Sequence, residues 1–140
     1  MTAKKSRQKD VDQSTAELTE AEWAIIKVVW ELAPCTAGTV QEVLAQSRDW
    51  AYSTVKTTMD RMVKKGFLEI EKIRNLQLFK ATISKRQAVK GEFHKMLKRA
   101  FDGALTPLMQ YVLENEDLSE NEISQLREMV SEAESKQQER

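Results

Sequence analysis

The segment from 50 to 84 carries a helical pattern of apolar positions followed directly by a strand pattern. Apolar residues recur at spacings of three or four, which predicts a helix with one buried stripe: Val55, Met59, Met62 and Val63. Ser53 is placed to cap this helix with its hydroxyl. Gly66 suits a left-handed stop, after which Phe67 packs back on the last turn. A helix of about three turns, ending at Lys65, is therefore expected.

Two strands are predicted after this helix, at 68–73 and 76–83. Apolar residues alternate in both, although Phe79 makes the inward face of the second strand ambiguous. The turn between them is Arg74-Asn75, in which Asn tolerates a positive φ. The two strands would form a hairpin beside the helix.

Two further helices are predicted upstream. A capping box of Thr19 and Glu22 begins the first, which ends before Pro34. Thr36 caps the second, which runs to about Ser47. Its expected buried positions are Val40, Val43 and Leu44. Three helices joined by short turns and followed by a hairpin indicate a winged helix-turn-helix, which lays one helix in the major groove of DNA.

The C-terminal half shows three amphipathic helical patterns. One follows a capping box at Ser84 and Gln87, and another follows a box at Ser119. Between them, Thr106 and Pro107 suit the cap and first position of a helix. The polar segment after Ala133 is expected to fray.

About fifty residues make a poor core alone, so these helices are expected to pack against a second copy of the chain. Folding back on the N-terminal half is the alternative. The expected dimer contacts are Phe93, Leu97, Phe101, Leu108, Val112, Ile123 and Leu126. The predicted fold is mainly α with a small β wing. It divides into a flexible tail at 1–17, a winged-helix domain at 18–84 and a helical dimerisation domain at 85–135.

The charges along the chain are unevenly distributed, although the 22 basic and 22 acidic residues cancel. Residues 50–90 carry 10 Lys and Arg against 3 Asp and Glu, a net charge of +7. Residues 91–140 carry 6 against 11, a net charge of −5. Binding to phosphate depends on such local basic charge. The outward residues expected to meet DNA are Ser53, Thr54, Lys56, Thr57, Arg61, Lys64, Lys65 and, at the hairpin tip, Arg74.

The composition argues against catalysis and against a resident metal or cofactor. His94 is the single histidine and Cys35 the single cysteine, so neither a metal cluster nor a Ser-His catalytic arrangement is indicated. The four glycines form no phosphate-binding loop. No apolar run has the length of a membrane span, and no secretory signal is visible. The sequence thus predicts a cytoplasmic protein that does not insert into membranes.

Several sequence stretches resemble the penicillinase-repressor family of bacterial transcription regulators, the BlaI/MecI/CopY type. They are LTEAEW from Leu18, the run from Ile25 to Pro34, TVQEVL from Thr39, WAYSTVKTTMDRMVKKG from Trp50 and EDLSENEI from Glu116. The resemblance implies an N-terminal winged helix, a C-terminal dimerisation domain and a homodimer that represses transcription from a palindromic operator. It places Thr54, Lys56, Thr57 and Arg61 at the major groove, and Lys64 and Lys65 near the DNA backbone.

Three departures from the family pattern stand out. The wing tip is Arg74-Asn75, where the family usually has Gly-Arg. In the β-lactam branch a membrane sensor triggers cleavage at an Asn-Phe bond, and the matching positions here are Tyr111-Val112. The copper branch ends in paired cysteines, which this chain lacks. A membrane sensor protease is therefore only an implied partner, and copper sensing by that route is excluded.

Two function hypotheses follow. The first is a dimeric repressor that binds a pseudo-palindromic operator. The second is a protein–protein adaptor that uses the winged-helix scaffold to dock a partner. The local surplus of basic charge favours the first.

Overall fold

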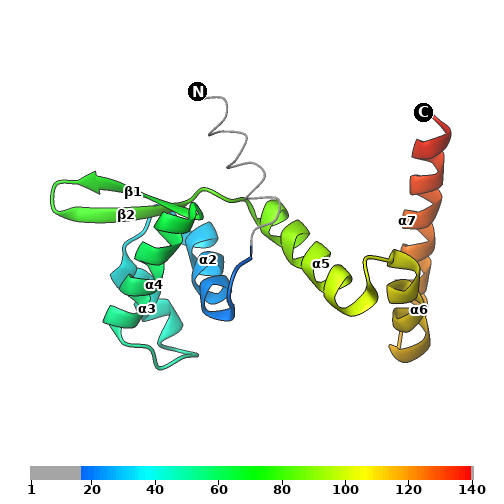
Figure 1. Ribbon diagram of the computed structural model, residues 1–140, viewed down its shortest axis with the longest axis horizontal. Helices are drawn as coiled ribbons and strands as arrows, with labels where there is room; N and C mark the ends of the chain where they lie inside the picture. The colour runs from blue at the N-terminus through cyan, green and yellow to red at the C-terminus, as the bar shows by residue number, and fades with distance from the viewer. Residues whose placement is uncertain (1–16, 140) are drawn as a thin grey trace. The chain divides into compact units, whose positions relative to one another are not determined.

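The structure is a computed structural model that describes residues 17–139. The expected flexible tail therefore lies, except for Glu17, outside the described residues. In chain order the elements are α2 (Glu20–Leu32), α3 (Ala37–Leu44), α4 (Tyr52–Lys65), β1 (Leu68–Ile73), β2 (Leu76–Ala81), α5 (Lys85–Phe101), α6 (Leu105–Asn115) and α7 (Glu120–Gln138) (Figure 1). The predicted class, mainly α with a two-stranded wing, is confirmed.

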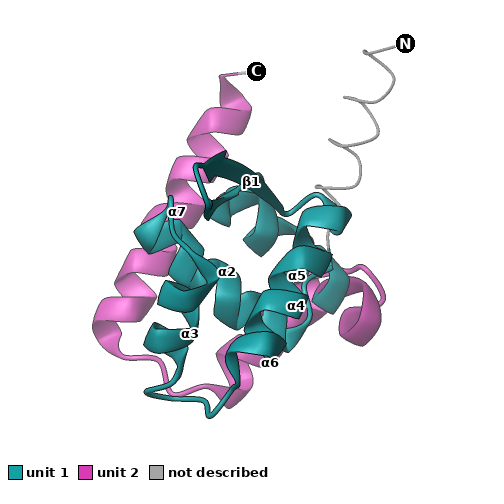
Figure 2. Ribbon diagram, turned by 90° about the vertical axis from the view of Figure 1, so that its left-hand side faces the viewer, with its two compact units in different colours: residues 1–96 teal, residues 97–140 magenta. Residues whose placement is uncertain are grey.

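The chain divides into two compact units, residues 1–96 and 97–140, with α5 crossing the boundary (Figure 2). In the first unit α2, α3 and α4 pack on one another, and the β1–β2 hairpin packs beside them. Their shared core consists mainly of aliphatic side chains, with Ile25, Ile26, Val29, Val40, Val55, Met59, Met62 and Phe79 fully buried.

Local capping signals begin and end the helices of the first unit. The Thr19 hydroxyl accepts from the Glu22 amide and the Glu22 carboxylate accepts from the Thr19 amide, as the predicted capping box requires. The Thr36 hydroxyl caps α3 by accepting from the Thr39 amide. At the end of α4, Gly66 has a φ of 86°, and the Phe67 amide donates to the Met62 carbonyl at 2.9 Å. This is the predicted left-handed stop, and it turns the chain directly into β1.

The antiparallel hairpin has its inward face at Phe79. Its register pairs Ile70 with Phe79 and Leu68 with Ala81, so these four share one face. Phe79 is fully buried, which resolves the ambiguity of the second strand. The backbone of Phe79 also exchanges two hydrogen bonds with Cys35, at 2.7 and 3.2 Å. These two hydrogen bonds hold β2 of the wing against the connection between α2 and α3.

Four local expectations were wrong. The N-cap residue of helix α4 is Ala51, which provides no side-chain cap, and Ser53 lies inside the first turn. Helix α6 begins after Ala104 without a side-chain cap, so Thr106 does not cap it. Val43 is 40% exposed, because α3 ends at Leu44 and turns only its Val40 side to the core. Helix α7 continues past Ala133 to Gln138, since its own backbone hydrogen bonds extend that far.

Candidate nucleic-acid interface

Helix α4 is the element that presents most of the predicted contact residues. Val55, Met59 and Met62 are buried and fix its rotation against the core. The opposite face therefore points away from the core. It exposes Ser53, Thr54, Thr57, Arg61 and Lys64. The structure thus brings five of the eight predicted DNA-contact residues onto one helix surface.

Lys56 lies on the side of α4 that faces the wing. Its Nζ donates to both carboxylate oxygens of Asp60, at 2.8 Å each. The same ammonium group lies 5.9 Å from the centre of the Phe79 ring, close enough for a cation–π attraction. Lys56 is therefore oriented by contacts from both α4 and β2.

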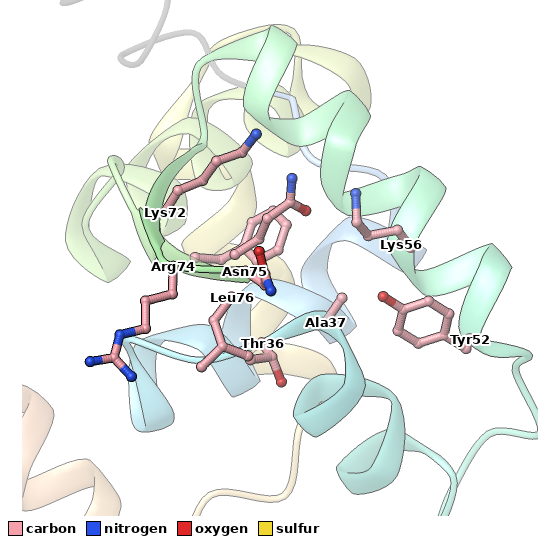
Figure 3. A pocket seen from close by; sticks show the side chains of 10 residues that line it. Thr36, Ala37, Tyr52, Lys56, Lys72, Arg74, Asn75 and Leu76 are labelled. Atoms are coloured by element: carbon pink, nitrogen blue, oxygen red, sulfur yellow. The ribbon is translucent and has the colours of Figure 1, made fainter.

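A cleft of about 380 Å³ lies between the N-terminal part of α4, the start of α3 and the wing (Figure 3). Among the ten described residues that line it, none is acidic. Lys56, Lys72 and Arg74 give it positive charge, and Thr36, Tyr52, Asn75 and Gln77 add neutral polar groups. A concave, donor-rich surface of this kind suits a phosphodiester strand.

Tyr52, Lys72 and Gln77 also line the cleft, although the sequence patterns did not indicate them. The alternation of strand side chains was the available signal, because Lys72 and Gln77 are a register pair on the same side as Phe79. Tyr52 lies in the first turn of α4 and is 52% exposed. Because the helix was expected to begin after Ser53, Tyr52 was not predicted to be part of it.

The wing tip exposes Arg74 in an unusual backbone conformation. The turn is at Arg74-Asn75 as expected, but Arg74 and not Asn75 takes the positive φ, of 57°. The neighbouring pair Ile73 and Leu76 is about half exposed at 49% and 56%. Arg74 is therefore exposed at the tip of the wing, next to two partly exposed apolar residues.

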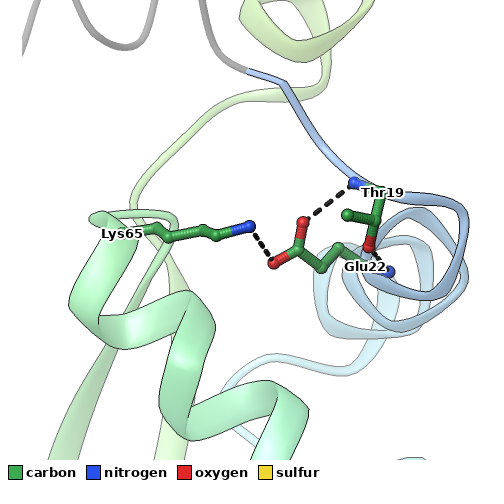
Figure 4. A network of polar contacts seen from close by, with 3 residues as sticks. All are labelled: Thr19, Glu22 and Lys65. Atoms are coloured by element: carbon green, nitrogen blue, oxygen red, sulfur yellow. Dashed lines mark hydrogen bonds and ion pairs between the residues drawn. The ribbon is translucent and has the colours of Figure 1, made fainter.

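Lys65 has a partner within the fold. Its Nζ donates to Oε2 of Glu22 at 2.8 Å, and Oε1 of Glu22 accepts the Thr19 amide at 2.8 Å (Figure 4). Glu22 is 1% exposed. Burial by itself would raise the pKa of Glu22, but the hydrogen bonds from Lys65 and Thr19 and the charge of Lys65 outweigh it and lower this pKa. Of the predicted contact residues, Lys65 is the one paired with a buried carboxylate.

The C-terminal unit leaves much apolar surface uncovered. Neither α6 nor α7 contains a fully buried residue. A groove of about 420 Å³ between them is lined by Met109, Leu113, Ile123, Leu126 and Val130. Of the predicted dimer contacts, Leu97 is already buried within its own chain and Phe93 is 38% exposed. Four others are half-buried, namely Phe101, Leu108, Val112 and Leu126.

Other reactive groups have ordinary surroundings. Cys35 is buried, which raises the pKa of its thiol. His94 is exposed and stacks edge-on against Phe93. Within residues 17–139, no three His, Cys, Asp or Glu side chains cluster closely enough to hold a metal ion. None of the described helices has the length and apolar character needed to cross a membrane.

Comparison with known proteins identifies a family. The family model described as penicillinase repressor matches residues 18–132. The methicillin resistance regulatory protein MecI of Mammaliicoccus sciuri is 26% identical over 121 residues, which cover 86% of this chain and 98% of the relative. The penicillinase repressor of Bacillus licheniformis is 26% identical over 123 residues, 88% of this chain and 96% of the relative.

Among solved structures, the chain is similar to the solution structure of the DNA binding domain of the repressor BlaI. The sequence identity is 23% and the TM-score 0.47, with 52% of this chain and 89% of that chain covered.

Proposed function

This chain belongs to the penicillinase repressor family, and from that membership we propose that it is a cytoplasmic transcriptional repressor, not an enzyme, that binds operator DNA as a homodimer. The observation that carries the proposal is the cleft that residues of α4, the start of α3 and the wing line together, with three cations and no acid among its lining residues. Arg61 and Lys64 of α4 and Arg74 at the wing tip are exposed as well.

In the proposed complex, α4 and the wing contact different parts of the DNA. Helix α4 enters the major groove, where Thr54, Thr57 and Arg61 meet base edges and phosphates. Lys64, in the last turn, approaches the DNA backbone. Arg74 and Lys72 of the wing follow the neighbouring backbone. Lys65 serves mainly to orient α4, because its ammonium group is held by the buried Glu22.

The uncovered C-terminal unit supports the homodimer. Seven of its large apolar side chains are at least 37% exposed, namely Leu105, Met109, Tyr111, Leu113, Ile123, Met129 and Val130. A unit of this size cannot hide them with its own residues. We propose that residues 85–135 pair with the same region of a second copy. Two-fold symmetry then requires a pseudo-palindromic operator with one α4 in each half-site.

Release from the operator follows from this arrangement. One small winged helix offers few contacts, so each half-site alone binds weakly. Linking two of them raises affinity through effective concentration. A signal that loosens the dimer would therefore release the DNA without altering α4. A membrane sensor protease could act in this way by cutting α6, although the Asn-Phe bond of the β-lactam branch is replaced here by Tyr111-Val112.

The test is an electrophoretic mobility shift with duplex DNA from the chain's own promoter region, repeated at several salt concentrations. A repressor gives a sequence-dependent shift that weakens steeply as salt rises. An adaptor that uses the same scaffold for a protein partner gives no shift that depends on sequence. That second outcome would refute the proposal.

A further inference from the structure

The ion pair between Lys56 and Asp60 lies on the surface proposed to face DNA. The Lys56 side chain is 26% exposed and that of Asp60 45%. Both carboxylate oxygens of Asp60 accept from the ammonium group, which also lies 5.9 Å from the centre of the Phe79 ring. The charge of Lys56 is thus partly neutralised before any ligand arrives.

Asp60 has no evident structural need. It is the one acidic residue of α4, and it lies between the outward Thr57, three positions earlier, and the exposed Arg61. An ion pair four residues apart on a helix surface contributes only about 0.3–0.5 kcal/mol. A carboxylate in this position also repels every phosphate that approaches the helix. Such a residue weakens DNA binding in general, which suggests a role in selectivity.

We propose that Asp60 is a specificity-determining residue that restrains Lys56 on non-cognate DNA. This inference rests on the proposed function. At the cognate site, the carboxylate of Asp60 accepts a hydrogen bond from the N4 amino group of a cytosine in the major groove. Lys56 then leaves Asp60 and contacts a phosphate. On other sequences the DNA offers the carboxylate no hydrogen-bond donor. Asp60 then stays paired with Lys56 and repels the DNA phosphates.

The expected change in DNA affinity can be calculated from its dependence on salt concentration. Each phosphate neutralised by a freed lysine steepens the dependence of log K on log salt by about 0.9. At a salt concentration of about 0.1 M, one such contact corresponds to a five- to tenfold change in affinity. The effect should appear on random-sequence DNA, where the pair stays closed.

The wing offers a matched control. Glu71 and Lys80 form an ion pair at 3.2 Å, with 53% and 45% of their side chains exposed. Glu71 pairs with Leu78 in the hairpin register, on the side opposite Phe79. Glu71→Gln therefore frees a lysine and removes one negative charge, as Asp60→Asn does, but outside α4.

The experiment uses the full chain and measures affinity for a random-sequence duplex between about 50 and 200 mM salt. Asp60→Asn should bind this duplex five- to tenfold more tightly at about 0.1 M, with a steeper salt dependence. Glu71→Gln should change the affinity for this duplex much less, and Asp60→Glu should bind it about as tightly as the parent does. An unchanged affinity for Asp60→Asn, or equal gains in Asp60→Asn and Glu71→Gln, would overturn the proposal.

Two further measurements distinguish the proposed coupling between Asp60 and Lys56 from a general effect of net charge. Lys56→Gln should hardly change random-sequence binding in the parent but should weaken it in the Asp60→Asn background. Equal effects in both backgrounds contradict the restraint. Selection of preferred sites from a random library should show a cytosine preference that Asp60→Asn loses at one position per half-site. A preference that persists in the variant contradicts the base contact.

The same data distinguish failure of the inference from failure of the proposed function. If the parent protein selects no DNA sequence at all, the repressor assignment fails. The salt dependence on the random duplex still decides whether Asp60 restrains Lys56.

Discussion

The ammonium group of Lys65 donates to the carboxylate of Glu22 at 2.8 Å and so joins the last turn of α4 to the first turn of α2. Glu22 is almost fully buried and also accepts the Thr19 amide. One carboxylate therefore caps its own helix and fixes the end of the proposed recognition helix. The position of α4 depends on this contact as well as on the apolar core.

The first prediction concerns pH. Because the fold lowers the pKa of Glu22 below its ordinary value of 4.5, the stabilisation by Glu22 is complete above that value. It is lost as the pH falls through the lower pKa of the folded state. Urea unfolding of the parent between about pH 6 and pH 3 should show this loss. Glu22→Gln should be less stable near neutral pH and should lose less on acidification.

Glu120→Gln is the control for this experiment. Glu120 is an exposed acid in the first turn of α7, whereas Glu22 is a buried one in the first turn of α2. A variant at Glu22 that follows the pH profile of the parent would show that the pair with Lys65 contributes nothing.

A second prediction concerns Arg61. Arg61→Ala should weaken operator binding about tenfold or more, because a base contact is worth roughly 1–3 kcal/mol. The fold should survive, since Arg61 is exposed. Titration of labelled operator with the variant gives the affinity, and circular dichroism checks the helix content. Lys27→Ala, which removes an exposed cation of α2, should bind as the parent does. Equal affinity in the Arg61 variant would mean that α4 does not read the operator through this residue.

The third prediction addresses the wing. Arg74→Ala should weaken specific and random DNA by similar factors and reduce the salt slope by about one, because Arg74 is expected to contact the backbone. Filter binding at several salt concentrations measures both quantities. A loss confined to the operator would instead assign sequence reading to Arg74.

A fourth prediction tests the dimer in the full chain. Ile123→Asp places a charge in the apolar groove between α6 and α7, where burial in a dimer would strongly disfavour it. Sedimentation should show monomers, and operator affinity should fall because the two winged helices act separately. Ser124→Asp, on an exposed polar position of the same helix, should remain a dimer. A dimeric Ile123 variant with full affinity would place the interface elsewhere.

The fifth prediction concerns the stop of α4. Gly66 has a φ of 86°, which residues with a Cβ adopt only with strain. Space is not the obstacle, because a Cβ there would meet no atom within 4 Å. Gly66→Ala should therefore cost about 1 kcal/mol in the free energy of unfolding. Gly38→Ala, in the regular turns of α3, should be neutral or stabilising in the same denaturation measurement.

The sequence by itself determined the features that depend on near neighbours. The capping boxes at Thr19 and Ser119, the stop at Gly66 and the two strands of the wing all follow from residues within a few positions of each other. The outward face of α4 was also predictable, since a helix with one apolar stripe must turn its other side to solvent.

The tertiary structure alone decided which of several local options was used and which distant groups meet. Lys65 reaches Glu22 across 43 positions of sequence, and Phe79 bonds to the backbone of Cys35, although neither residue carries a local signal for its partner. The start of α4 moved from Ser53 to Ala51 despite the good capping side chain at Ser53. The physical reason is that capping and turn signals act between near neighbours in the chain, whereas core packing and buried ion pairs join groups that are far apart in sequence.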